Sequence, residues 1–234
     1  MPTPSTPTER AWGFAPKLSL ACGVLGPLLF VAAFLIEGAT RPNYSARRHF
    51  ISSLSLGERG WRQIANFLLS GTLLLGFAIG LRRRFHAGNG SRWGPNLLGL
   101  YGLSYLGAGL FATDPVLGYP PGAPRRRTAR GTLHNLASLV AFTSLPAACF
   151  VLARRFAHNP AWRGWSHYSI STAMLMSVFV ILASLAARFA PNESPGLFQR
   201  LSVITGNGWI VLLALRLLRD RMPPKAEPRT IPAA

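Results

Sequence analysis

The chain has 234 residues, of which 49% are hydrophobic and only 14% are charged. Lys and Arg outnumber Asp and Glu by 25 to 7, so the formal net charge is +18. In a soluble protein this excess would suggest a nucleic-acid partner. Here the basic residues lie between long apolar segments, where anionic lipid headgroups account for them. We therefore expect the partner to be a lipid bilayer and exclude nucleic acid.

Six apolar segments follow one another along the chain, each close to the ~20 residues that cross the ~30 Å hydrocarbon layer as a helix. Lipid offers no partner for unpaired backbone groups, so each segment must be helical. The pattern predicts an all-α polytopic membrane protein, a six-transmembrane-helix bundle over residues 18–218. The expected spans are residues 18–36, 63–81, 95–113, 132–153, 168–187 and 201–218.

The flanking segments and the basic residues predict the orientation. Residues 1–17 and 219–234 are rich in Pro and polar residues and are expected to be disordered cytoplasmic tails. Compact Arg blocks, at 82–84 and 154–155, follow the second and fourth spans. Because cytoplasmic loops carry the excess of Lys and Arg, we expect a multi-pass protein of the cell membrane with both termini in the cytoplasm.

With this orientation the two longest loops, residues 37–62 and 114–131, face the outside, and long loops often carry function. Within the first, Ser45 to Leu56 is expected to form a short interfacial helix. Cys22 and Cys149 lie inside apolar segments, which favours a packing role over a disulfide or a Cys-based metal site.

Polar residues gather on the outer side of the predicted bundle. They lie in the outer loops or near the outer ends of the spans: Glu37, His49, Ser52, Ser53, Ser55, Asn66, Asp114, His134, Asn135, Ser202, Thr205 and Asn207. Asp114 and His134 are expected to approach within hydrogen-bonding distance or the length of one bridging water. The spans that carry them are antiparallel neighbours, so both residues should lie at the same membrane depth.

Three motifs connect the chain to a known family. They are the block from Tyr44 to Gly57 with His49, Ser52 and Ser55 at its centre, the segment 109–115, and the segment 131–135. In these motifs the chain, over about residues 18–218, resembles the bacterial membrane proteins of the domain of unknown function 998. The resemblance implies a six-helix membrane fold without an assigned activity, and it implies that Asp114 and His134 match polar positions of the family.

Three interpretations of the polar cluster remain open. The first is structural, because Asp, His, Ser and Asn at helix ends cap free amides and hold loops to a bundle. The second is a membrane hydrolase acting on a lipid-like substrate. Its catalytic set would be His134 as general base, Asp114 as orienting partner and Ser52 or Ser55 as nucleophile. Alternatively, His49, Asp114 and His134 would hold a zinc ion that activates water.

The third interpretation is a transporter, a lipid-binding protein or a sensor with a lipid or small-molecule ligand, in which an outer His responds to pH. Ceramidase-type and adiponectin-receptor-type hydrolases also use Ser, Asp and His near one face. Their paired His motif is missing here, because residues 168–187 and 201–218 contain no His. No phosphate-binding loop or Cys-based motif indicates any cofactor besides zinc.

Overall fold

The computed structural model describes residues 7–85, 88–124 and 126–220. Within these ranges the chain forms six α-helices and two short 3₁₀ helices, η1 and η2. In chain order they are α1 (Pro7–Thr40), η1 (Ile51–Ser55), α2 (Gly60–Arg84), α3 (Trp93–Leu110), α4 (Ala129–Ala157), η2 (Pro160–Trp162), α5 (Trp165–Phe189) and α6 (Pro195–Arg219).

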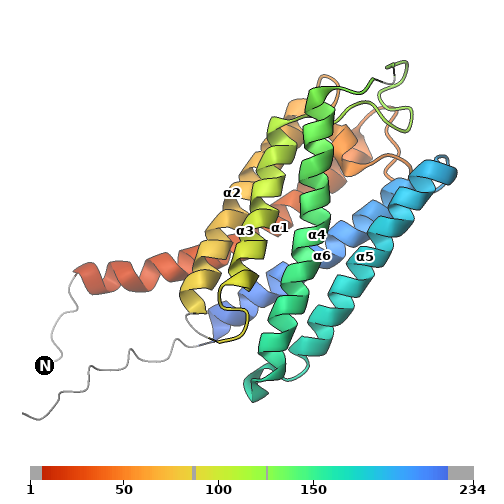
Figure 1. Cartoon of the computed structure of the whole chain (residues 1–234). Helices are drawn as coiled ribbons and strands as arrows, with labels where there is room; N and C mark the ends of the chain where they lie inside the picture. The colour runs from red at the N-terminus through yellow and green to blue at the C-terminus, as the bar shows by residue number, and fades with distance from the viewer. Residues whose placement is uncertain (1–6, 86–87, 125, 221–234) are drawn as a thin grey trace, which may run out of the picture.

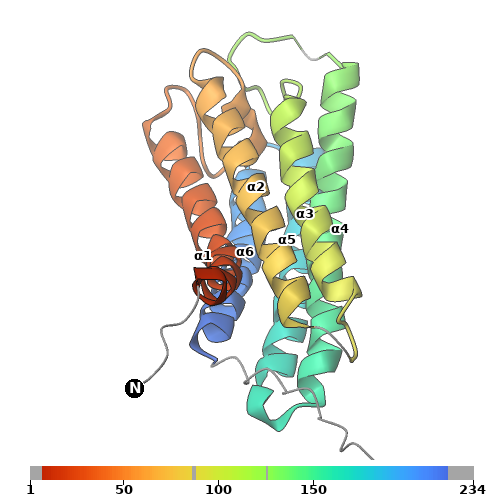
Figure 2. The same cartoon turned by 90° about the vertical axis from the view of Figure 1, so that its left-hand side faces the viewer.

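The six helices form a closed ring. Each packs against its neighbours in the chain, and α6 returns to α1. Figures 1 and 2 show the helices side by side and alternating in direction. Residues 41–59, 111–128 and 190–194 connect helices at one end of the bundle, which we call the loop end. The start of α1 and the end of α6 lie at the opposite end, which we call the terminal end.

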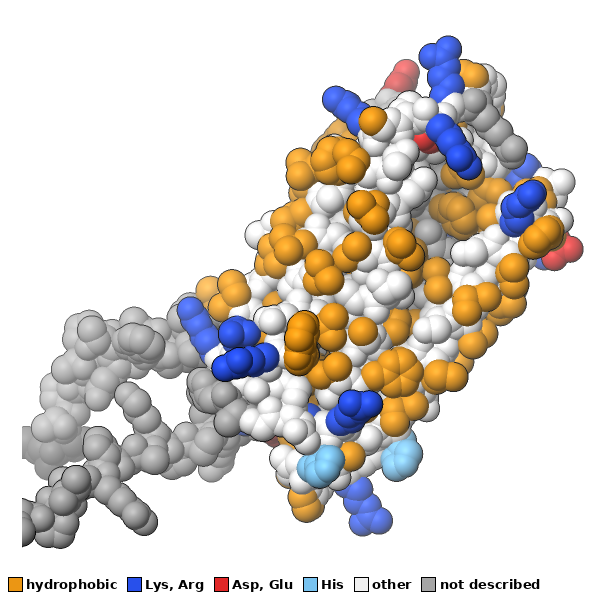
Figure 3. Space-filling model, viewed as in Figure 1, with side chains coloured by type: hydrophobic (Ala, Val, Ile, Leu, Met, Phe, Trp, Pro, Cys, Tyr) orange, Lys and Arg blue, Asp and Glu red, His pale blue; other side chains and the backbone are white. Residues whose placement is uncertain are grey.

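Five of the helices are long and apolar enough to cross a membrane: Lys17–Thr40 within α1, and α2, α4, α5 and α6. Large apolar side chains on their outer surfaces are exposed, most of all on α5, where Met174, Val178, Ile181 and Leu185 are between 47% and 56% exposed. A belt of hydrophobic side chains between two charged ends is visible in Figure 3. The protein is therefore a multi-pass membrane protein.

Helix α3 is the sixth of the ring and is not among these five. It is shorter and contains five glycines, and Gly102 among them brings its backbone close to α2. A Cβ atom on Gly71 would lie 2.9 Å from the carbonyl oxygen of Gly102, and one on Gly102 would lie 3.1 Å from that of Gly71. Small residues allow such close helix packing in membranes. Helix α3 is thus held tightly on its α2 side.

Helices α2, α4, α5 and α6 extend beyond the predicted spans at both ends, and three other segments also differ from the prediction. Helix α1 begins at Pro7, so residues 7–17 are helical where a disordered tail was expected. The third helix ends at Leu110, because the backbone is extended at Phe111, and not at residue 113. The expected interfacial helix over residues 45–56 is reduced to η1, and Ile51, Ser53, Leu54 and Ser55 in it are buried. The predicted C-terminal tail lies outside the described residues beyond Asp220.

Candidate functional site

A groove of about 930 Å³ runs between α4 and α5 near the loop end. Figure 3 shows it as a recess between these two helices. Most of its wall is apolar, and Leu139, Ile181 and Leu185 in that wall are between 49% and 60% exposed. The groove therefore opens on the apolar outer surface of the bundle.

A smaller cavity of about 50 Å³ adjoins this groove inside the bundle. Five residues line both spaces: Ser52, His134, Ser138, Phe142 and Gln199. The remaining wall of the cavity is mainly aromatic and aliphatic and includes Tyr101 and Tyr105. Its volume exceeds the ~10–15 Å³ that one water requires. The polar residues thus lie where the groove meets the centre of the protein.

His134 has a defined tautomer. Its Nδ1 lies 2.8 Å from the carbonyl oxygen of Phe111 and 3.2 Å from that of Ala108. Carbonyl oxygens only accept hydrogen bonds, so Nδ1 must carry a proton. In the neutral ring Nε2 is then an acceptor, and it is buried without a partner among the described residues. His134 joins α4 to the end of α3 and keeps one acceptor available.

Ser52 is placed by η1, which dips into the loop end of the bundle. The amide of Ile51 donates to Oε1 of Gln199 on α6 at 2.7 Å, which orients Gln199 and the start of η1 together. No hydrogen bond joins Ser52 to His134 among the described residues. The Ser52 hydroxyl and the His134 imidazole therefore line the same cavity without forming a hydrogen bond to each other.

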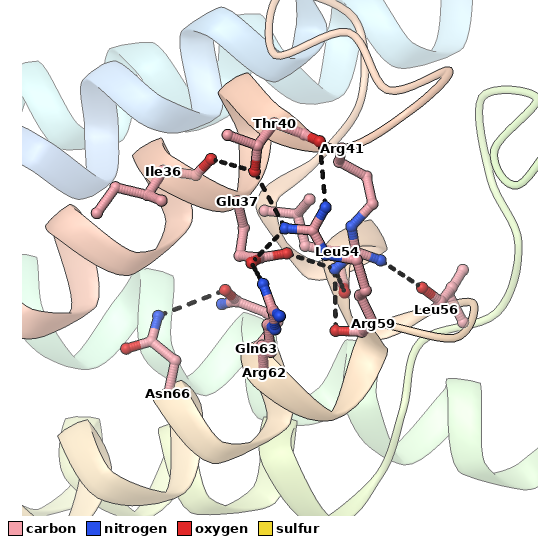
Figure 4. Close-up of polar contacts among 10 residues, drawn as sticks. All are labelled: Ile36, Glu37, Thr40, Arg41, Leu54, Leu56, Arg59, Arg62, Gln63 and Asn66. Atoms are coloured by element: carbon pink, nitrogen blue, oxygen red, sulfur yellow. Dashed lines mark hydrogen bonds and ion pairs between the residues drawn. The ribbon is translucent and has the colours of Figure 1, made fainter.

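An ion cluster around Glu37 fixes the loop that contains η1 (Figure 4). The Glu37 carboxylate accepts from Arg41 at 2.9 Å and from Arg59 and Arg62 at 2.8 Å each. Arg41 is buried and also donates to the carbonyl oxygens of Leu54, Leu56 and Arg59. Thus α1 holds both the end of η1 and the start of α2.

Arg200 of α6 holds the other half of the same loop. It is buried and donates to the carbonyl oxygens of Ala46, His49 and Gly196, and to the hydroxyl of Tyr44. A bulkier residue at Gly196 would overlap the backbone of the loop, since an added Cβ would meet the carbonyl oxygens of His49 and Ala46. The loop is therefore held by hydrogen bonds to both α1 and α6.

His49 connects the two long loops. The amide of Ser45 donates to its Nδ1 at 3.0 Å, and its ring packs between those of Tyr44 and Tyr119, at 5.3 and 5.1 Å between centroids. Burial lowers the pKa of His49, and the positive charges of Arg48 and Arg200 lower it further. Both effects favour the neutral imidazole, which suits a packing role.

Asp114 caps the start of α4. Its carboxylate accepts from the amide and the hydroxyl of Thr128, at 2.9 and 2.7 Å. The Thr128 hydroxyl in turn accepts from the amide of Gly131 at 3.0 Å. A Cβ at Gly131 would overlap the Asp114 carboxylate, so a larger residue there would displace that carboxylate. The hydrogen bonds from Thr128 lower the pKa of Asp114.

The structure divides the predicted polar cluster into separate groups. Ser52, Asp114, His134 and Asn135 line the groove. Asp114 and His134 use different partners, and no hydrogen bond between them occurs in the parts of the chain that the structure describes. The rest of the set lies elsewhere: Glu37 in the ion cluster, His49, Ser53 and Ser55 under the first loop, and Asn66, Ser202 and Asn207 buried in the bundle.

Asn66 and Asn207 connect helices inside the bundle. The side-chain amide of Asn66 donates to the Phe30 carbonyl at 3.2 Å, and that of Asn207 to the hydroxyls of Tyr101 and Tyr105 at 3.3 Å. Ser202 donates to the carbonyl of Met176 at 2.9 Å. Thr205 is half-buried on α6. These residues stabilise helix contacts on α1, α3 and α5.

The structure gives no support to a three-ligand zinc site. Among residues 7–85, 88–124 and 126–220, no three His, Cys, Asp or Glu side chains converge as a group that could hold a metal ion. Of the predicted ligands, His49 uses Nδ1 for Ser45 and Asp114 uses both oxygens for Thr128. The zinc set and the Ser–His–Asp set remain predictions.

Sequence reasoning missed Arg41, Arg200 and Gln199, which position the first loop. A signal was available for two of them, because Arg41 and Arg200 stand at the ends of apolar segments, where a charge must be paired with acceptors. Arg41 also follows Glu37 at helical spacing.

The family described as "Protein of unknown function (DUF998)" has a model that matches residues 24–216. The chain belongs to this family. No curated protein and no solved structure matches it. The match to DUF998 confirms the resemblance. It extends over the residues that form the groove, the cavity and the contacts that hold the first loop to α1 and α6.

The ion cluster of this DUF998 protein predicts the effect of Glu37→Gln. The substitution keeps the shape but leaves Arg41 buried without its counter-ion, so we expect a loss of about 3 kcal/mol of stability. Thermal unfolding in detergent measures it. Glu58→Gln is the matched control, because Glu58 is exposed in the same loop and forms no salt bridge among the described residues. Equal effects of the two changes would contradict the role given to Glu37.

The cap on α4 predicts a pH dependence. The pKa of Asp114 is lowered in the folded state, so its stabilisation is complete above the ordinary Asp value near ~3.9 and is lost as the pH falls through the lowered value. Asp114→Asn should therefore destabilise the protein at pH 7, by about 1 kcal/mol or less because the site is exposed.

We expect this difference to vanish at the lowest pH that the fold tolerates. Thermal unfolding of both proteins across pH measures it. Asp220→Asn serves as control, since no hydrogen bond to the Asp220 side chain is found in the described chain. A deficit of Asp114→Asn that grows toward acid would refute the assignment.

Proposed function

We propose that this protein binds a membrane lipid in the groove between α4 and α5, with a polar junction of Ser52, His134 and Gln199 in contact with a polar group of the ligand. The observation that carries the proposal is an apolar groove of about 930 Å³ that opens on the outer surface of the bundle. Its volume lies within the ~300–1,000 Å³ of small-molecule sites.

The open side of the groove favours a lipid over a water-soluble ligand. Its exposed wall is made by Leu139, Ile181 and Leu185, which belong to helices that cross the bilayer. A ligand can therefore enter sideways from the membrane without passing through water. The acceptor Nε2 of His134 supplies a partner for a hydroxyl or amide hydrogen of the ligand. This role requires no chemical step, and it belongs to the lipid-binding class of the interpretations above.

We further propose six spans with both termini in the cytoplasm. Helix α3 fills its place in the ring between α2 and α4, and at ~1.5 Å per residue its 18 residues extend ~27 Å, close to the hydrocarbon thickness. Arginines occupy the last turns of α2, α4 and α6, all at the terminal end of the bundle. The positive-inside rule favours a cytoplasmic location for that end.

Reporter fusions test this topology. We expect a cytoplasmic signal from fusions after Arg84 and after Arg219, and an extracytoplasmic signal from a fusion in residues 120–124. A protein with five spans would give signals of opposite location from the fusions after Arg84 and after Arg219. That result would place α3 outside the membrane.

Filling the groove tests the binding of lipid. Ser184 lines the groove on α5, whereas Ser171 is exposed on the same helix outside it. The phenyl ring in Ser184→Phe would occupy the space of an acyl chain, so we expect lipid affinity to fall about tenfold, equivalent to ~1.4 kcal/mol. Native mass spectrometry with added phosphatidylglycerol measures the bound lipid. Ser171→Phe should bind as the wild type does, and equal binding by both variants would exclude the groove as the site.

A further inference from the structure

We infer that the groove selects a phospholipid with a net negative headgroup, whose phosphate is bound by Arg126, Arg127 and Arg188. This inference rests on the proposed lipid binding and adds the class of ligand. All three residues line the groove, two from the loop before α4 and one from the last turn of α5. Figure 3 shows basic side chains on both sides of the recess at its upper end.

The three guanidinium groups lack an acidic partner. Every salt bridge among the described residues is made to Glu37, by Arg41, Arg59 and Arg62. Arg126, Arg127 and Arg188 are exposed, and the guanidinium carbon of Arg188 lies 5.6 Å from the ring centroid of Phe189. Uncompensated positive charge from two separate elements thus converges on one end of an apolar groove.

One negative group also lines this space. The Asp114 carboxylate is committed to the amide and hydroxyl of Thr128 at the start of α4. Three guanidinium groups against one carboxylate leave the loop end of the groove positive. A second negative group, supplied by the ligand, therefore reduces the excess positive charge there.

The depth of the groove fits a lipid of one leaflet. Along α5 the lining residues extend from Arg188 to Val180, a distance of ~12 Å at ~1.5 Å per residue. One leaflet contributes half of the ~30 Å hydrocarbon layer. With the arginines at the headgroup level, the apolar part of the groove covers most of the length of an acyl chain. The phosphate and the chain of one molecule thus meet the basic and the apolar parts at the same time.

Headgroup chemistry separates the ligand classes. A guanidinium donates two parallel hydrogen bonds to a phosphate and remains charged at every physiological pH. The choline of a zwitterionic lipid would bring a positive charge beside three others. Phosphatidylglycerol has the same phosphate without that cation. We therefore expect the anionic lipid to bind more tightly than a zwitterionic lipid of equal chain length.

The experiment compares two lipids with identical dioleoyl chains, phosphatidylglycerol and phosphatidylcholine, titrated into the full-length protein in detergent at moderate salt. We expect phosphatidylglycerol to bind at least about tenfold more tightly, the effect of one good charge-assisted contact. In the triple variant Arg126→Gln, Arg127→Gln and Arg188→Gln, the preference should fall to within about threefold. Inorganic phosphate, added alone, should neither bind nor compete at millimolar concentration.

A matched triple variant removes the same charge at the terminal end: Arg92→Gln, Arg163→Gln and Arg219→Gln. It should retain the preference of the wild type. An equal loss in both triple variants would show a general charge effect and overturn the inference, as would effective competition by inorganic phosphate. If Ser184→Phe lowers the affinity for both lipids while the wild type shows no preference between them, the proposed lipid binding stands and the headgroup inference fails.

Discussion

Charged side chains buried at the ends of two helices have to be neutralised or fully hydrogen-bonded, and the loop end of this protein is organised by that requirement. Glu37 at the end of α1 forms ion pairs with three arginines. One of them, Arg41, also donates hydrogen bonds to three backbone carbonyls in the loop and just before α2. Arg200 at the start of α6 uses carbonyls on the other side of that loop. A charge left unpaired at this depth is costly, so the loop has little freedom to move away.

These contacts of the first loop with α1 and α6 determine where the polar residues of the site lie. They bring η1 into the bundle, so that Ser52 and the amide of Ile51 meet Gln199 of α6. The second long loop is then placed by the aromatic contacts of His49 and Tyr44 with Tyr119. The end of α3 is placed by the bonds of His134 to its carbonyls. The polar junction of the groove is therefore a consequence of how the loops are held.

The two sides of the helix ring differ in how tightly they pack. Between α2 and α3 the contact of Gly71 with Gly102 brings the backbones together and leaves no room for a ligand. Between α4 and α5 the helices diverge toward the loop end, and the groove occupies that space (Figure 1). Pro146 in α4 lies just beyond the deep end of the groove and removes one backbone hydrogen bond there. An opening on this side faces the bilayer directly, and for this reason we propose a lipid as its ligand.

The sequence by itself determined the membrane class and the six helices, because a run of apolar residues long enough to cross a bilayer can satisfy its backbone only as a helix. The family followed from the resemblance of three motifs, which the match over residues 24–216 confirms. The sequence also predicted one polar cluster at the outer end, which the structure divides into separate groups. It did not reveal which of them meet. Asp114 and His134 both line the groove but form hydrogen bonds with different partners, and Thr128 lies beside Asp114 only because the loop folds back onto α4. The groove, the partners of Arg41 and Arg200, and the inward course of η1 depend on contacts between segments distant in the chain. Hydropathy reports the environment of each residue separately, whereas those contacts are decided by the packing of the whole ring.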